Sequence, residues 1–263
     1  MALFGIGLLL ASTGSVEAAA RDEVGQIVER IKRADYEGDR SALKKNYDVL
    51  DAFVANKELA SRVRYWRGFA LWRSAINGAN DATADQNALE AELKQAIDEF
   101  KVAAASDPGF VDAKVGMINC LGFIAYFHRQ ENERMTELLG QIFPLVKELR
   151  TAAPDNPRFR WVMGPILWYT PADRGGGIDK AIANYQHALE VCSQVKPDAD
   201  NLEPSWGQPE LMMSLAYTYL QKSPPDVEAA ERYARQALEA VPYWHYLRDI
   251  LMPQIAAAKT KGS

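Results

Sequence analysis

The stretch "AIDEFKVAAASDP", residues 96–108, carries the pattern that decides the fold. Ala96, Phe100, Ala103 and Pro108 follow one another at spacings of four, three and five residues. Small residues at this spacing form one stripe of a helix and let a second helix approach closely, while the aromatic ring wedges between the two and the proline ends the helix. Because such a hairpin cannot bury its apolar face alone, the pattern predicts neighbouring hairpins that stack side by side.

The same spacing occurs in two other parts of the chain. It returns in full near the end and in part before that, where a serine takes the place of the proline: Ala230, Ala234, Ala237 and Pro242, then Ala181, Tyr185, Ala188 and Ser193. One supersecondary unit met at several places in a chain indicates a helical repeat architecture. A small residue is expected ten positions after the proline, where two helices meet. Ten residues after Pro154 stands Gly164, which is small, and ten residues after Pro108 stands Ile118, which is not.

The rest of the chain is also helical in pattern. Apolar residues recur at helical spacing after Arg21, and the alternating β-branched stretches typical of strands are missing. Clusters of Gly, Pro, Asn and Asp separate the helices, among them residues 76–87 and 196–209. We therefore predict an all-α domain of about ten helices over residues 21–258, followed by a disordered tail at residues 259–263.

Three consecutive glycines, residues 175–177, precede a strongly patterned helix and raise the alternative of a phosphate-binding loop. Nucleotide-binding loops need a Lys-Ser/Thr pair or a preceding strand, and "DRGGGIDKA" has neither. A helix N-terminus still attracts anions, which Arg174 and Lys180 would assist. The favoured interpretation is a tight turn with positive φ between the two helices of a hairpin.

These motifs resemble the tetratricopeptide repeat (TPR), a helix-turn-helix unit of about 34 residues with an A-x3-F spacing and a late proline. The resemblance covers most of residues 61–252 but is degenerate, since the loop at 76–87 is long and residues 136–154 lack the alanines. The segments "APDNPR", "YTPADRGGGIDKAI", "PSWGQPELMMSLAYTY" and "ALEAVPYW" are similar to a family of exported bacterial TPR-like proteins. Most members of that family have no assigned activity, so the resemblance implies a fold and a compartment.

The first twenty residues, "MALFGIGLLLASTGSVEAAA", have the pattern of a signal peptide: an apolar run, then small residues with A-x-A spacing at Ala18 and Ala20. No Lys or Arg precedes the run, and the cut falls after Ala18 or Ala20. The alternative is an uncleaved anchor, although the run is shorter than the roughly 20 residues of a membrane span. We expect an exported protein, in the periplasm, with no stable membrane span once the signal is removed.

Composition and scattered reactive residues limit the function. Among 263 residues the net charge is −5, which excludes a general nucleic-acid binder. The three histidines lie far apart and no nucleophile motif is present, so we predict no metal, no cofactor and no catalytic activity. Cys120 and Cys192 are interpreted as two separate thiols, with a disulfide as the alternative in an oxidising compartment.

What remains is a surface. In stacked hairpins the first helices line a concave groove, and six tryptophans and eleven tyrosines supply residues that are enriched in interface hot spots. Our candidate groove residues are Asn119, Arg158, Trp161 and Tyr217, and the first helices also hold Arg64, Arg67, Phe123, Trp168, Tyr169 and Met213. Core packing is the alternative for each aromatic, and an exposed side chain without a partner is the alternative for Asn119 and Arg158. The predicted function is a scaffold that binds an unidentified protein or peptide. The alternative is a small-ligand adaptor working beside an envelope transporter, which would need a closed cavity of about 300–1,000 Å³. The oligomeric state stays open.

Overall fold

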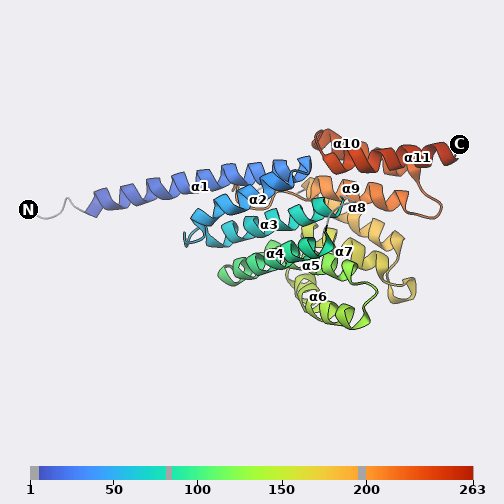
Figure 1. Cartoon of the computed structure of the whole chain (residues 1–263), viewed down its shortest axis with the longest axis horizontal. Coiled ribbons are helices and arrows are strands. Elements are labelled where there is room, and N and C mark those ends of the chain that lie inside the picture. The colour runs from blue at the N-terminus through green and yellow to red at the C-terminus, as the bar shows by residue number, and fades with distance from the viewer. Residues whose placement is uncertain (1–5, 81–84, 195–199, 263) are drawn as a thin grey trace, which may run out of the picture.

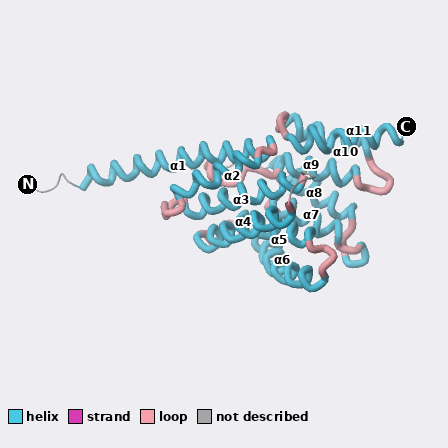
Figure 2. Tube along the Cα trace, viewed as in Figure 1, coloured by secondary structure: helices cyan, strands magenta, loops and turns pink. Residues whose placement is uncertain are grey.

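The computed structural model describes residues 6–80, 85–194 and 200–262, and within these ranges it contains helices and no strand (Figures 1 and 2). This confirms the all-α prediction. Eleven α-helices are present in the described residues: α1 (Ile6–Glu37), α2 (Arg40–Val49), α3 (Ala60–Ala79), α4 (Gln86–Ser106), α5 (Val111–Phe127), α6 (Asn132–Ala152), α7 (Pro157–Tyr169), α8 (Ile178–Gln194), α9 (Gln208–Leu220), α10 (Val227–Ala240) and α11 (Met252–Gly262). Short helical turns lie at η1 (Leu50–Phe53), η2 (Ala172–Arg174) and η3 (Tyr246–Leu251).

The repeated small-residue stripes lie where the hairpins close. In α4, α8 and α10 all nine stripe residues are buried, with exposed fractions of 4% or less. Each of these helices packs on the helix before it, so that α3/α4, α7/α8 and α9/α10 form hairpins, and α4 and α8 also pack on the helix that follows. The fold is therefore TPR-like, as the spacing predicted.

Glycines of the facing helices make room for the aromatic wedges. The ring of Phe100 fills the space above Gly68 and Gly116, where an added Cβ would lie 2.9 and 2.5 Å from ring carbons. Tyr185 occupies the same place above Gly164. The small residue predicted ten positions after Pro108 thus exists, but at Gly116 and not at Ile118.

Gly164 supplies a stability test with a matched control. A Cβ at position 164 would lie 2.0 Å from the Tyr185 ring, and Tyr185 is 4% exposed. We expect Gly164→Ala to lower the free energy of unfolding by about 1–3 kcal/mol through overpacking. Gly140→Ala in α6 meets nothing within 4 Å and should raise it by about 0.5–1 kcal/mol through helix propensity. Urea unfolding followed by circular dichroism measures both; equal effects would contradict the wedge.

Helix α6 departs from the stack. It packs against α5, and α7 also packs against α5, so α6 protrudes at the lower edge of the molecule (Figure 1). Its sequence lacks the alanine stripe that would allow a close approach to a second neighbour. Phe143 on α6 is left 54% exposed. Helix α6, whose segment lacks the alanine pattern in the sequence, is therefore attached to the array along one side, through α5.

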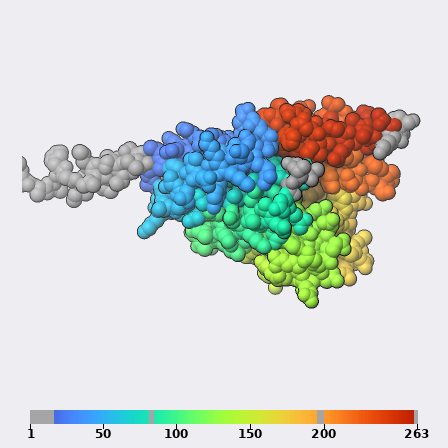
Figure 3. Space-filling view, viewed as in Figure 1, coloured from blue at the N-terminus to red at the C-terminus, as the bar shows by residue number. Residues whose placement is uncertain are grey.

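The two ends of the array meet. The red C-terminal helices lie against the blue N-terminal helices (Figure 3), and the rings of Tyr36 and Trp244 are 4.9 Å apart between centroids. Tyr36 Oη also donates a hydrogen bond of 2.7 Å to Glu210 on α9. Tyr36 of α1 thus joins the first part of the described chain to α9 and to the segment after α10. Contacts between residues so far apart in the chain leave no periodic signal in the sequence.

The triple glycine turns the chain between α7 and α8, as predicted. Gly175 and Gly177 have φ of 83° and 103°, a region open to glycine and costly for other residues. Gly177 N donates to Leu167 O at 2.8 Å, which ties the loop to the end of α7. The backbone NH group of Gly177 is thus used inside the turn.

The C-terminus corrects one prediction. Residues 259–262, expected in a disordered tail, continue α11 as far as Gly262. Lys259 Nζ lies 2.8 Å from Glu231 of α10, and this ion pair holds the last turns against the preceding hairpin. Across the described residues, no helix has both the length and the apolar character that crossing a membrane requires.

Candidate binding face

The inner wall, formed by the first helices α3, α5, α7 and α9, is partly filled by the chain itself. The connector between α8 and α9, described over residues 200–207 and here called the plug, lies on it. Leu202, Pro204 and Trp206 are buried, whereas Asn201 and Ser205 are exposed. The plug begins with a turn, in which Glu203 N donates to Asp200 O at 3.1 Å, and residues 204–207 have no regular secondary structure.

Trp206 is the centre of the plug. Its ring lies 5.9 Å from Phe69, 5.5 Å from Trp72 and 5.5 Å from Trp161 between centroids. Its Nε1 donates to Tyr65 Oη at 2.8 Å. This box of aromatic rings, drawn from α3 and α7, closes that part of the inner wall.

Side-chain donors of the wall hold the plug by its backbone. Trp66 Nε1 donates to Leu202 O at 2.8 Å, and Arg158 donates to Trp206 O at 3.2 Å. Two ion pairs fix its beginning, Arg62 with Glu203 at 2.6 Å and Arg21 with Asp200. The plug is thus held through apolar side chains, backbone carbonyl groups and two acidic side chains.

Three of the four candidate groove residues belong to this filled part. Trp161 is 9% exposed, and its Nε1 donates to Ser214 Oγ at 2.8 Å, so its side chain packs in the core. Arg158 pairs with Asp112 through both carboxylate oxygens and is occupied with the plug. Asn119 is half-buried and accepts a 2.9 Å hydrogen bond from Trp72 Nε1. All three help to build the wall.

The fourth candidate, Tyr217, lies on a part of the wall that is open. It is 38% exposed, and near it Tyr126 of α5 and Tyr169 of α7 are 51% and 75% exposed. The Trp168 ring lies 6.2 Å from Tyr169 and 5.9 Å from Tyr217. We call these residues, together with Tyr246 of η3, the tyrosine face.

Electrostatic coupling links the phenols of this group. Burial raises the pKa of the Tyr217 phenol, and so do the phenols of Tyr169 and Tyr126. Burial and the phenol of Tyr217 raise the pKa of Tyr246 to about 12. The phenols of Tyr217 and Tyr246 therefore stay protonated at neutral pH.

The composition of the tyrosine face suits recognition. The Arg129 guanidinium lies 4.5 Å from the centre of the Tyr126 ring at the rim of the face. Tyrosine, tryptophan and arginine are the residues enriched in binding hot spots, because they offer large rigid surfaces with a polar end. Sequence reasoning named Trp168, Tyr169 and Tyr217 but missed Tyr126, whose signal was its position seven residues after Asn119 on the same face of α5.

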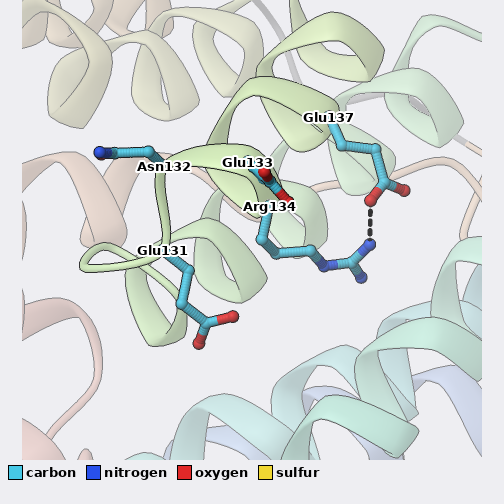
Figure 4. Close-up of a pocket in the computed structure, with 5 residues that line it drawn as sticks. All are labelled: Glu131, Asn132, Glu133, Arg134 and Glu137. Carbon is cyan, nitrogen blue, oxygen red and sulfur yellow. Dashed lines mark hydrogen bonds and ion pairs between the residues drawn. The ribbon is translucent and has the colours of Figure 1, made fainter.

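A charged pocket lies at the start of α6, apart from these aromatics. It has a volume of about 550 Å³ and is lined by residues of the turn and first coils of α6: Glu131, Asn132, Glu133, Arg134 and Glu137 (Figure 4). Arg134 pairs with Glu137 at 2.5 Å in the wall of the pocket. Within the described residues, no group of His, Cys, Asp or Glu is arranged to hold a metal ion.

His128 next to this pocket joins three helices. Its Nε2 lies 2.6 Å from Glu90 of α4 and its Nδ1 lies 2.8 Å from Glu131, just before α6. The hydrogen bonds to Glu131 and Glu90 raise the pKa of His128 above its usual range. Only the protonated ring donates to both carboxylates at once.

This arrangement predicts a pH-dependent contribution to stability. Because the folded pKa of His128 exceeds the unfolded value of about 6.5, its contribution should be fully present below that pH and lost as pH rises through the folded pKa. We expect the difference in unfolding free energy between the wild type and His128→Gln to fall over this window. Glu131→Gln should lower the pKa of His128 in an NMR titration. A pKa at or below the ordinary value in the wild type would contradict the contacts.

The two cysteines do not form a disulfide with each other. Cys120 is buried and Cys192 half-buried, and both thiols are free. Burial raises the pKa of both thiols, which opposes formation of the nucleophilic thiolate. The interpretation as two separate thiols is confirmed, and neither is prepared for chemistry.

Comparison with known proteins supports the fold. No family model and no curated protein matches the chain. Among solved structures, the HusA haemophore from Porphyromonas gingivalis is similar with a TM-score of 0.56 and 16% sequence identity, covering 74% of this chain and 92% of that chain. A thermophilic TPR protein from Thermus thermophilus aligns with a TM-score of 0.46 and 19% identity, over 84% and 99% of the two chains. At such identities the likeness to HusA shows a shared helical fold, and the protein described here is an all-α, TPR-like helical-hairpin protein.

Proposed function

We propose that the protein is an exported, non-catalytic scaffold that binds a segment of another protein on its tyrosine face. The observation that carries the proposal is the exposure of Tyr126, Tyr169 and Tyr217 on three successive inner helices. Monomeric proteins rarely leave adjoining large aromatic side chains in water unless they serve recognition. A helical-hairpin array presents such residues on one continuous surface.

Photo-crosslinking in intact cells tests this function. A photoreactive phenylalanine analogue at position 169 should form a discrete adduct with one protein, and Tyr217→Ala should abolish that adduct. Position 243 is the matched control, because Tyr243 is 38% exposed like Tyr217 but packs against Tyr36 and Arg33. The same adducts from both positions, or no adduct from position 169, would contradict the proposal.

Export is part of the same proposal. Glu17, Ala18 and Ala19 are exposed, Ala20 is partly buried, and Val24 and Ile27 are fully buried between the helices. The buried residues of α1 thus follow directly on Ala20, after which the sequence predicts the cut. Mass spectrometry of the protein from the envelope fraction should find Ala19 or Arg21 as the first residue. A retained start in that fraction would favour the anchor instead.

A small planar ligand is the second candidate. HusA, with which the chain shares its fold, is a haemophore, and the Trp168 and Tyr169 rings are stacked with an interplanar angle of 18°. A protein that binds such a ligand would act as an adaptor beside an envelope transporter. Titration with haemin, read by its absorbance, tests it: saturable binding lost in Tyr169→Ala would favour this candidate. The openness of the face, with Tyr169 75% exposed, favours a protein segment.

A further inference from the structure

Helix α6 carries a stripe of exposed residues that alternate at spacings of three and four. The members of this α6 stripe, all of them exposed, are Glu133, Thr136, Gly140, Phe143, Lys147 and Arg150. Residues at this spacing lie along one side of a helix, as they do in the seam at which two helices pack. The buried residues Leu138, Ile142 and Val146 belong to the other side of α6. The stripe is therefore a side of the helix that its own chain leaves uncovered.

Helix α6 also lacks a neighbour that comparable helices have. Helices α2, α4 and α8 each pack on the helix that follows, whereas α6 has no comparable packing on α7 in the described residues, and it lies at the edge of the molecule (Figure 3). Among the described residues, the ion pairs of α6 involve none of Glu133, Lys147 and Arg150. These three charges are therefore available to a second molecule.

The centre of the α6 stripe combines an exposed ring with an open space. Phe143 is 54% exposed, and a Cβ added at Gly140 would meet nothing within 4 Å. Glycine is less favourable than alanine inside a helix, and packing within the chain does not require it at this position. The ring of Phe100 already rests on Gly68 and Gly116 in the core. Phe143 of a second molecule fits on Gly140 in the same way.

The α6 stripe is complementary to itself when two copies lie antiparallel. With Phe143 of each copy opposite Gly140 of the other, the equal spacings place Thr136 opposite Lys147 and Glu133 opposite Arg150. An acid then meets a base at both ends of the contact. Glu133 and Arg150 also suit the dipole of α6 itself. Their alignment with the central ring and glycine, which the dipole does not explain, indicates the second copy.

We propose that two copies of the chain associate through the α6 stripe as an antiparallel helix pair with two-fold symmetry. Two-fold dimers are the commonest homo-oligomers, and they require a surface that is complementary to itself. Helix α6 has 21 residues and is about 32 Å long, so the contact is narrow and belongs with weak interfaces of less than about 1,200 Å². We therefore expect a dimer that dissociates on dilution. The tyrosine face has no residue on α6, so the dimer and the proposed function are tested separately.

Sedimentation equilibrium of the full chain over a range of concentrations tests the dimer. The mean mass of the wild type should rise from that of one chain towards that of two. Phe143→Glu should raise the dissociation constant roughly tenfold or more, because it replaces the central ring with a charge. Val102→Glu is the matched control, since Val102 of α4 is an exposed apolar residue, 44% exposed, outside the stripe. Its association should equal that of the wild type.

A second variant excludes unfolding as the cause of dissociation. Gly140→Gln fills the space that the ring of the second copy needs, so it should also raise the dissociation constant roughly tenfold. Glutamine is a better helix former than glycine, so thermal melts should show no loss of stability. A wild type that stays monomeric at every concentration would overturn the proposal, and so would association that neither Phe143→Glu nor Gly140→Gln weakens.

A charge exchange tests the antiparallel alignment. Arg150→Glu alone sets acids opposite each other at both ends and should weaken association roughly fivefold, as expected for two exposed ion pairs. Glu133→Arg together with Arg150→Glu brings opposite charges together again and should restore most of the affinity. If the exchange restored nothing while Phe143→Glu still dissociated the dimer, the two helices would not be aligned as proposed, and the antiparallel pair would be overturned.

Discussion

Replacing Trp206 with alanine is expected to lower the free energy of unfolding by about 3–5 kcal/mol, as truncation of a buried tryptophan does. The indole is 5% exposed and fills the space between Phe69, Trp72 and Trp161. Its loss also leaves Tyr65 Oη, inside a fully buried side chain, without the Nε1 donor, and an unsatisfied buried hydroxyl adds to the cost. Urea unfolding followed by circular dichroism measures the change.

Two further variants separate packing from hydrogen bonding in the plug. Trp206→Phe keeps most of the ring contact and loses the donor, so the expected loss is about 1–3 kcal/mol. Ser205→Ala changes the exposed neighbouring residue and should stay within about 0.5 kcal/mol of the wild type. If Trp206→Ala unfolded at nearly the wild-type urea concentration, the plug would not be part of the core.

The hairpins were predictable because their signals are local. Ala96, Phe100 and Ala103 lie within two turns of one helix, and that short pattern already specifies close approach and a wedge. The glycine turn at 175–177 was predictable for the same reason, since positive φ is a property of single residues. The small residue that faces Phe100 was expected at position 118 and is Gly116. The error arises because the angle at which two helices cross determines which residue faces the ring, and spacing along the sequence does not give that angle.

The filling of the groove was not predictable in the same way. Residues 196–209 were interpreted as a loop cluster because of their Pro, Asp and Gly content. Leu202, Pro204 and Trp206 are apolar residues within this cluster, but so short a run does not say which surface covers them. Trp161 and Arg158 were then assigned to an open groove that the plug occupies. Tyr217 lies outside the reach of the plug, and its prediction as a binding residue stays a prediction.

A buried charge cluster, which the sequence did not predict, lies where α1, α3 and α9 meet. Arg73 of α3 is 5% exposed and lies 2.7 Å from Asp35 of α1, which is 2% exposed. Glu210 of α9, 1% exposed, accepts hydrogen bonds from Tyr36 Oη and Gly207 N. The cluster joins α1, α3 and the helix that carries Tyr217. Its two acids and one base come from distant parts of the chain, and only the fold brings them together.

Arg73→Met should therefore destabilise the protein by about 3–5 kcal/mol, because it leaves the Asp35 carboxylate buried and unpaired. Arg235→Met is the matched control: Arg235 pairs with Glu231 but is 63% exposed, and such a surface pair contributes about 0.5 kcal/mol or less. The double variant Arg73→Met with Asp35→Asn removes both charges and keeps an amide oxygen for Asn77. It should be more stable than Arg73→Met alone. Strict additivity of the two single changes would contradict a coupled pair.

The pH dependence of Arg73→Met distinguishes charge from packing. Burial raises the pKa of Glu210, and Arg73 acts in the opposite direction, so removing Arg73 should raise this pKa further. A carboxyl group whose folded pKa lies above its unfolded value binds more protons in the folded state, so its contribution to stability falls as pH rises through that interval. The cost of Arg73→Met relative to the wild type should thus be largest at neutral pH and shrink as the solution is acidified. If the loss of stability did not depend on pH, Arg73 would stabilise the protein by packing and not by its charge.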